Sequence, residues 1–215
     1  MDKAAQDITF LTKEAGPLPY YISEPYLSSL YTYATWAARR NPKTVIVEIG
    51  CHEGISTLIM ALALKAQKTA GMIYTIDPAF ICPVTIPDVN NPAGILYTHD
   101  NTLFTRRAQT LKVAKYIHKT PGFSWEILPN WTRDIDLLYV DGEHTYDGVS
   151  RDCQWLRHLA LGGHAAFDDW MAPIRQAVID SVENFTAEGL QFTILHESIN
   201  PPENNMIITL LCRDF

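Results

Sequence analysis

Two acidic motifs directly follow apolar runs that predict strands. The first is Asp141-Gly-Glu143-His144, after DLLYV, and the second is Asp168-Asp169, after HAAF. Because neighbouring parallel strands present their carboxyl ends at one edge of a sheet, we expect Asp141, Asp168 and Asp169 to lie close together. A hard divalent cation with oxygen ligands, Mg²⁺ first, would relieve their mutual repulsion. The sequence therefore predicts a metal site built from three carboxylates.

Two neighbouring residues are candidates for a general base at this site. The ordinary pKa of histidine lies near neutrality, whereas a glutamate needs burial to rise that far, so His144 ranks slightly above Glu143. Each residue taken alone also has a structural explanation. Asp141 or Asp169 can cap a following helix, and His144 can serve only the loop.

A glycine motif, Glu48-Ile-Gly50-Cys51-His-Glu-Gly54, follows the β-branched run KTVIV. The glycines remove side chains, so a ligand can lie against the backbone, and two hydroxyl residues, Ser56 and Thr57, can satisfy free amides at the next helix start. Asp77 ends the following strand, near the spacing of about 20 residues at which an acid reaches ribose hydroxyls. A dinucleotide is disfavoured because G-x-G-x-x-G is absent. A tight turn without a ligand remains the alternative.

Strands and helices alternate along the whole chain. The predicted helices are Pro25–Arg40, Ser56–Lys68, Asn101–Leu111, Tyr146–Leu161, closed by Gly162-Gly163, and Pro173–Ala187. The predicted strands are Lys43–Gly50, Gly71–Asp77, Val113–His118, Asp136–Asp141, His164–Asp168, Gln191–His196 and, after a turn at Asn200-Pro201-Pro202, Met206–Cys212. This alternation predicts an α/β fold, a doubly wound and mainly parallel seven-stranded sheet with an antiparallel hairpin at its C-terminal end.

The composition is that of a single globular domain over residues 1–215. The chain is 47% hydrophobic and 19% charged, with a net charge of −7, so nucleic acid is not an expected partner. No apolar run reaches the roughly 18 residues of a membrane span, and the first residues lack a signal-peptide pattern, so the cytoplasm is the expected compartment. The four scattered cysteines are expected as reduced thiols. Residues 1–42 form a helical lead-in, and residues 78–100, rich in proline, are expected to be a loop that covers the substrate.

The segment VIVEIGCHEGIST, followed by YTID, resembles motifs I and II of class I S-adenosylmethionine-dependent methyltransferases. The resemblance implies that the motif I residues line the methionyl part of S-adenosylmethionine and that Asp77 binds its ribose. Ser124, in GFSWE, falls near the strand end that contacts adenine, although a turn or helix cap explains it equally well. The expected cofactor contacts are Glu48, Gly50, Cys51, Gly54, Ser56, Thr57, Asp77, Ser124 and Asp141.

The segment YVDGEHTYDGVSRD, followed by LALGGHAAFDDW, resembles a branch related to macrocin-type sugar O-methyltransferases. Three aspartates bind Mg²⁺ in that branch, and their positions fall on Asp141, Asp168 and Asp169. The proposed base of the branch falls on Glu143, whereas catechol-type enzymes place a lysine at the position of His144.

The two resemblances together cover about Glu24 to Trp170. They imply a Rossmann-like methyltransferase fold and methyl transfer from S-adenosylmethionine to a hydroxyl of a sugar, polyol or phenol, aided by a divalent metal. A metal-independent N- or O-methyltransferase and a non-catalytic S-adenosylmethionine-binding subunit of a biosynthetic complex are the alternatives. Whether the chain forms a homo-oligomer stays open.

Overall fold

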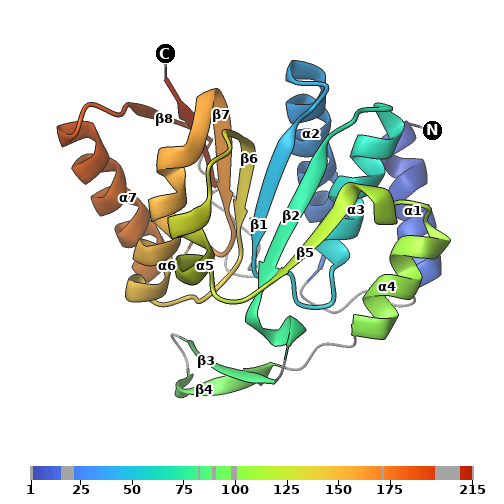
Figure 1. Ribbon diagram of the computed structural model, residues 1–215, viewed down its shortest axis with the longest axis horizontal. Coiled ribbons are helices and arrows are strands. Elements are labelled where there is room, and N and C mark those ends of the chain that lie inside the picture. The colour runs from blue at the N-terminus through green and yellow to red at the C-terminus, as the bar shows by residue number, and fades with distance from the viewer. Residues whose placement is uncertain are drawn as a thin grey trace.

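The computed structural model describes residues 2–15, 22–81, 83–88, 91–97, 101–170, 172–196 and 209–214. A seven-stranded sheet carries helices on both faces, and a separate two-stranded sheet lies beyond the carboxyl ends of its parallel strands (Figure 1). The helices are α1 (Lys3–Ala15), α2 (Glu24–Arg40), α3 (Ile55–Ala66), α4 (Asn101–Thr110), α5 (Ser124–Ile127), α6 (Tyr146–Asp152) and α7 (Ala172–Ala187). The large sheet contains β1 (Val45–Ile49), β2 (Met72–Asp77), β5 (Ile117–Pro121), β6 (Ile135–Val140), β7 (Leu159–Phe167), β8 (Phe192–His196) and β9 (Thr209–Arg213).

The strand order is β5-β2-β1-β6-β7-β9-β8. The first five strands pair in parallel, and β9 runs antiparallel to both β7 and β8. The predicted doubly wound sheet with a C-terminal antiparallel hairpin is confirmed. The chain builds outward from β1 through β2 to β5 and then returns to β6 on the other side of β1. Ligands of open α/β sheets bind at such a reversal of strand order, outside the carboxyl ends of the strands.

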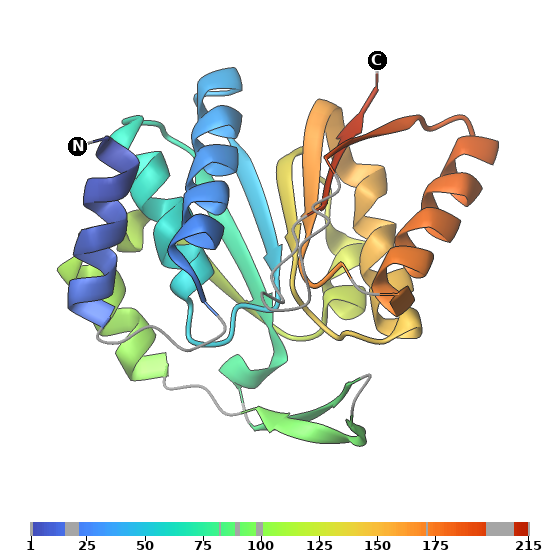
Figure 2. The ribbon, with the colours of Figure 1, turned by 180° about the vertical axis from the view of Figure 1, so that it is seen from behind.

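Both faces of the sheet are buried. One apolar cluster joins the sheet to α1, α2 and α3, and a second joins its other face to α6 and α7. Figure 2 shows these two groups of helices from behind, with the sheet between them. The alternating apolar face of α2 and the uniformly buried strand β6 explain why these segments lie inside. Among the described residues, no helix combines the length and the apolarity that a membrane span requires.

The predicted helix Tyr146–Leu161 is wrong in its second half. Helix α6 ends at Asp152, a 3₁₀ helix follows over Cys153–His158, and β7 already begins at Leu159. The glycine pair that suggested a helix end lies inside β7, where its register with β6 shifts. A side chain on Gly163 would come within 2.8 Å of two backbone oxygens, so the pair permits an irregular strand rather than a helix cap.

The loop expected over residues 78–100 is largely a β-hairpin. A short 3₁₀ helix, Pro78–Phe80, leads to β3 (Val84–Asp88), which pairs antiparallel with β4 (Asn91–Tyr97). Residues 82, 89, 90 and 98–100 lie outside the described residues. Prolines concealed the strands, but both strands of a two-stranded sheet are edges, where proline is tolerated.

Two of the predicted strands have outcomes of their own: one is displaced, and the other lies partly outside the described residues. The weak strand predicted at Val113–His118 is displaced, because a 3₁₀ helix occupies Ala114–Tyr116 and β5 begins at Ile117. In the predicted strand Met206–Cys212, residues 206–208 lie outside the described residues, as does the turn at 200–202.

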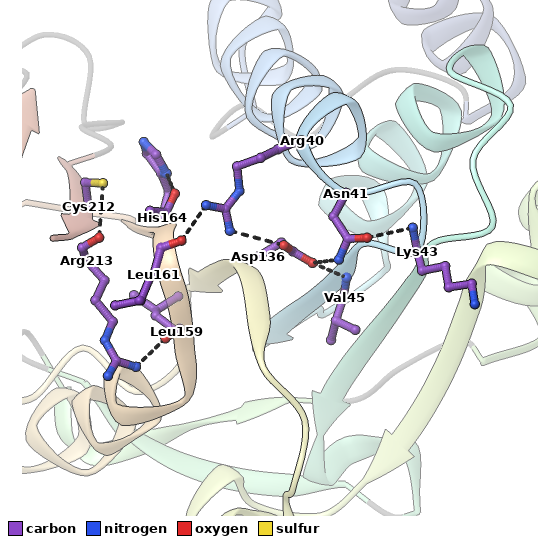
Figure 3. A network of polar contacts seen from close by, with 11 residues as sticks. Arg40, Asn41, Lys43, Val45, Asp136, Leu159, Leu161, His164, Cys212 and Arg213 are labelled. Atoms are coloured by element: carbon purple, nitrogen blue, oxygen red, sulfur yellow. Dashed lines mark hydrogen bonds and ion pairs between the residues drawn. The ribbon is translucent and has the colours of Figure 1, made fainter. Parts of the chain in front are cut away.

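A buried carboxylate ties α2 to the amino ends of β1 and β6 (Figure 3). Asp136, 4% exposed, accepts hydrogen bonds from the side-chain amide of Asn41 and the backbone N–H of Val45, both at 2.9 Å. Arg40 adds an ion pair with a distance of 3.3 Å between Nη2 and Oδ1. This network lies at the end of the sheet opposite to the carboxyl ends of the parallel strands.

Replacing Asp136 by alanine will therefore lower the free energy of unfolding by about 2 to 4 kcal/mol, because buried donors lose their acceptor. Denaturant unfolding measures the loss, and Asp134→Ala is the matched control because Asp134 is exposed. The control should change stability by less than about 0.5 kcal/mol. Equal effects of the two substitutions would contradict a structural role for the network.

Candidate active site

The residues that follow three neighbouring strands are aligned at one edge of the sheet. Each donates its backbone N–H to the last or next-to-last carbonyl of the adjacent strand, which extends the ladder past the strand ends. The donors are Gly50, Asp141 and Asp168, and the acceptors are Ile76, Ile49 and Val140, all at 2.9 Å. The sequence motifs are thus brought side by side in the order β2, β1, β6, β7.

The glycine loop and the acidic loop touch at the reversal of strand order. Gly50 has φ of 80°, and a Cβ on it would overlap the backbone carbonyl of Asp141. Gly54 also has φ of 80°, and a Cβ there would lie 2.5 Å from the ring of Phe104. Both glycines are therefore required by left-handed backbone conformation and by close packing of protein segments.

Asp77 joins the end of β2 to the glycine loop. Its Oδ2 accepts the backbone N–H groups of Cys51 at 3.0 Å and His52 at 3.1 Å, and its Oδ1 accepts that of Ala79 at 2.9 Å. His52 has φ of 47°, a left-handed conformation that is uncommon outside glycine and clusters at functional sites. The carboxylate thus holds the loop in a strained, defined shape, and Cys51 lies buried within it.

Glu48 is completely buried beneath the start of α3. It accepts hydrogen bonds from the hydroxyls of Ser56, at 2.5 Å, and Thr57. The prediction that these hydroxyls cap the helix is wrong, because Gly54 occupies the cap position and no side chain caps the helix. Burial raises the pKa of Glu48 to about 7, and the two hydroxyl donors oppose that rise.

The raised pKa of Glu48 predicts a stability that falls with pH. Because the folded pKa lies above the ordinary value of 4.5, this residue's contribution is fully present below pH 4.5 and is lost as pH rises through 7. Relative to Glu48→Gln, which imitates the protonated acid, the wild type will lose about 3 kcal/mol of unfolding free energy over this range. Denaturant unfolding of both proteins at several pH values measures the difference, and parallel curves would contradict it.

The predicted acidic cluster forms around a histidine. His144 lies between two carboxylates, with Nε2 at 3.4 Å from Asp141 Oδ1 and Nδ1 at 3.4 Å from Asp169 Oδ2. Asp168 is buried, and within the described part of the chain its Oδ1 has no hydrogen-bond partner. Burial, followed by the charges of Asp141 and Asp169, raises the pKa of Asp168 well above its usual range. Asp169 has φ of 50°, a left-handed conformation that turns the chain after the buried Asp168. The side chain of Asp169 faces His144.

The described residues contain no group of three or more His, Cys, Asp or Glu side chains arranged to hold a metal ion. The three aspartates are neighbours, as the sequence predicts, but the His144 ring lies between two of them. Within the described residues, Asp168 Oδ1 is a buried oxygen without a hydrogen-bond partner.

The side chain of Glu143 is engaged by Thr145 and Gly148. Its Oε1 accepts the hydroxyl of Thr145 at 2.5 Å, and its side chain packs against Gly148 in α6, where a Cβ would lie 2.6 Å from it. Of the two candidate bases, His144 is therefore the one that lies between the carboxylates.

Ser124 is buried at the start of α5, and its hydroxyl donates to Asp152 of α6. Burial raises the pKa of Asp152 to about 7. A Cβ on Gly142 would lie 2.9 Å from Asp152 Oδ2, so this pair lies directly behind the loop that carries the candidate bases. The sequence indicated Ser124 but not its partner.

Two tyrosines at the site were not anticipated. Tyr139 donates its hydroxyl to Asp141 Oδ2 at 3.2 Å, and the hydroxyl of Tyr26 forms a close hydrogen bond with that of Tyr139. Burial, more than any neighbouring charge, raises the pKa of both tyrosines. The only sequence signal was the position of Tyr139 two residues before Asp141, and nothing marked Tyr26.

Comparisons with known proteins identify the fold and the family of the chain. A family model described as a methyltransferase domain matches residues 47–170, more than half of the chain. The solved structure of the O-methyltransferase NovP has a TM-score of 0.74 at 14% identity and covers 100% of both chains. The O-methyltransferase TomG of Streptomyces achromogenes, involved in tomaymycin synthesis and solved with S-adenosylmethionine, has a TM-score of 0.61 at 18% identity, covering 100% of this chain and 91% of TomG.

An O-methyltransferase from Bacillus cereus, solved with S-adenosylhomocysteine, likewise has a TM-score of 0.61 at 13% identity, covering 100% of this chain and 92% of that one. At these identities the likeness shows a shared fold, and the family match adds the activity. The chain therefore belongs to the methyltransferase domain family and is a class I S-adenosylmethionine-dependent methyltransferase.

Proposed function

We propose that this protein transfers the methyl group of S-adenosylmethionine to a hydroxyl oxygen of a small molecule. The observation that carries the proposal is His144, held between two carboxylates directly beside the contact of the glycine loop with the acidic loop. A base adjoining the cofactor loop is the arrangement that deprotonation of a hydroxyl at the moment of transfer needs. The O-methyltransferase neighbours support oxygen as the acceptor atom.

The cofactor would lie across the carboxyl ends of β2 and β1. Gly50 and Gly54 would bring the loop backbone to its methionyl part, and Asp77, at the end of β2, would accept the ribose hydroxyls. The charges of this region fit a cofactor that carries a sulfonium and an ammonium group. Burial raises the pKa of both Glu48 and Asp168, and a cation bound beside them would favour their charged forms.

In the proposed reaction the acceptor oxygen forms a bond with the methyl carbon as the bond from carbon to sulfur breaks, which leaves S-adenosylhomocysteine. The hydroxyl proton passes to the imidazole ring of His144. Asp169, opposite Nδ1, keeps the ring oriented and stabilises the imidazolium. Asp141, on the acceptor side of the ring, would orient the hydroxyl.

A divalent cation, Mg²⁺ first, is part of the proposal. Asp141, Asp168 and Asp169 would hold it, and it would supply a Lewis acid that lowers the pKa of the acceptor hydroxyl. The support is the donor chemistry of three neighbouring carboxylates and the buried Oδ1 of Asp168, which has no hydrogen-bond partner among the described residues. The metal-independent alternative leaves the same residues to bind and deprotonate the acceptor.

The β3–β4 hairpin is the proposed cover of the acceptor. Figures 1 and 2 both show it beyond the carboxyl ends of the parallel strands, on the side of the candidate active site. Tyr97 lies edge-on to His52 of the glycine loop, with 5.9 Å between the ring centroids. Val84 and Ile86 share the half-buried face with Tyr97, whereas Leu96, on the opposite face, is 63% exposed. The face directed to the protein is therefore apolar.

If this face contacts the acceptor, Tyr97→Ala will raise the acceptor KM about tenfold and change the affinity for S-adenosylhomocysteine less than about twofold. Initial-rate kinetics and calorimetry measure the two quantities. Leu96→Ala, on the outer face of the same strand, is the control and should leave both unchanged. A change in cofactor affinity alone would show that Tyr97 supports the glycine loop instead of the acceptor.

Calorimetric titration with S-adenosylhomocysteine, followed by an acceptor screen that detects its release from S-adenosylmethionine, tests the whole proposal. The panel should contain sugars, polyols, phenols and matched amines. Turnover of hydroxyl acceptors supports the proposal. Preferential methylation of amines contradicts it, and cofactor binding without turnover across the panel favours a binding subunit.

A further inference from the structure

We propose that Tyr26 is a positioning residue of the active site, acting on Asp141 through Tyr139. Tyr26 belongs to α2 and lies outside the segment matched by the family model, residues 47–170. The inference rests on the proposed function to the extent that Asp141 is taken to orient the acceptor. The proposal means that α2, part of the N-terminal helical lead-in, helps to position an active-site residue at the carboxyl ends of the strands.

The hydrogen bonds between these residues have a defined direction. A tyrosine hydroxyl has one proton, and Tyr139 donates its proton to Asp141 Oδ2 at 3.2 Å. The hydroxyl of Tyr26 must then be the donor in its close contact with the oxygen of Tyr139. The chain runs from Tyr26 to Tyr139 to Asp141, and each donor polarises the next.

This chain fixes the orientation of the carboxylate. While Oδ2 of Asp141 accepts from Tyr139, Oδ1 lies 3.4 Å from Nε2 of His144. One oxygen of this planar group is therefore bonded to Tyr139 while the other faces the imidazole. Without the tyrosine donor, rotation of the carboxylate would change the position of Oδ1 relative to the imidazole.

Local structure explains why Tyr26 can reach this position. Ser23 caps α2 by accepting the backbone N–H of Tyr26 at 3.3 Å, which places the tyrosine in the first turn. Its ring enters the apolar cluster between α2 and the sheet, where Tyr139 also lies. The charge of Asp168 acts on Tyr26 as well, so the helix start lies beside the acidic cluster.

Packing alone does not require these hydroxyls. The surroundings are mainly apolar, and burying a hydroxyl in such a place is unfavourable unless it is hydrogen-bonded. Phenylalanine would fill the same volume without that requirement. The hydroxyls are therefore explained by their effect on Asp141, which a structural role would not predict.

Tyr26→Phe tests the proposal, with Tyr31→Phe as the matched control. Tyr31 is a second buried tyrosine of α2, and its hydroxyl donates at 3.0 Å to a carboxylate outside the site, that of Asp7. With an acceptor found in the screen, Tyr26→Phe should lower kcat about tenfold and leave the KM for S-adenosylmethionine unchanged. Tyr31→Phe should keep kcat within twofold. Equal losses in the two variants would overturn the proposal, because they would reflect damage to α2 in general.

The second measurement does not need turnover. The ¹⁵N signals of the His144 ring, assigned by their loss in His144→Gln, should shift in both Tyr26→Phe and Tyr139→Phe but not in Tyr31→Phe. Unchanged signals in Tyr26→Phe would overturn the proposal, whatever happens to kcat. If the signals shift while the wild type methylates no hydroxyl, the positioning role stands and the proposed function fails.

Discussion

Replacing His144 by alanine will lower methyl-transfer turnover by about 100-fold or more, while S-adenosylhomocysteine binds with nearly unchanged affinity. The range of general-base contributions in enzymes sets this magnitude. The imidazole lies between Asp141 and Asp169, so its removal takes away the proton acceptor without touching the glycine loop. Single-turnover kinetics and calorimetry separate the two effects. His118→Ala, which replaces an exposed histidine of β5, should leave both quantities unchanged.

The companion variant, Glu143→Gln, decides between the two candidate bases. Glu143 is bound to Thr145 and packed on Gly148, so we expect its substitution to lower turnover less than tenfold. A nearly silent His144→Ala together with a severe loss in Glu143→Gln would transfer the role of base to the glutamate. Such a result would also show that the loop rearranges when the cofactor binds.

The strand ends could be predicted from the sequence because they depend on local signals. Buried apolar runs closed by glycine or aspartate specify both the strand and the residue at its carboxyl end. In a parallel sheet that information also specifies which residues become neighbours. Gly50, Asp77, Asp141 and Asp168 are accordingly aligned in the structure as the motifs predict.

The features that the sequence did not reveal depend on contacts between distant segments. The irregular start of β7 arises where Gly163 approaches the backbone of another strand, and sequence periodicity does not report such an approach. Ser56 and Thr57 donate to Glu48 instead of accepting from the helix amides, because a fully buried carboxylate must receive hydrogen bonds from the protein. The contact of Tyr26 with Tyr139 joins residues 113 positions apart and has no local signature.

Activity will depend on a divalent cation, and excess chelator will lower turnover at least about tenfold, with recovery on addition of Mg²⁺. The pH dependence of this requirement follows from the protonation of Asp168. Its pKa is raised by burial and by two neighbouring aspartates, so a proton and a cation compete for the same carboxylate. The apparent affinity for Mg²⁺ must therefore increase as pH rises, since binding displaces that proton.

The variant Asp168→Asn tests whether this carboxylate binds the cation. The amide has the same shape but no charge to offer a cation, so the variant should need at least about tenfold more Mg²⁺ for half-maximal turnover. It should also lose much of the pH dependence of that requirement. Asp134→Asn, an exposed acid, is the control and should respond to Mg²⁺ as the wild type does. Full turnover in excess chelator would contradict the metal and leave proton transfer to His144, with Asp141 and Asp169 orienting the acceptor and the ring, as the complete chemistry of the site.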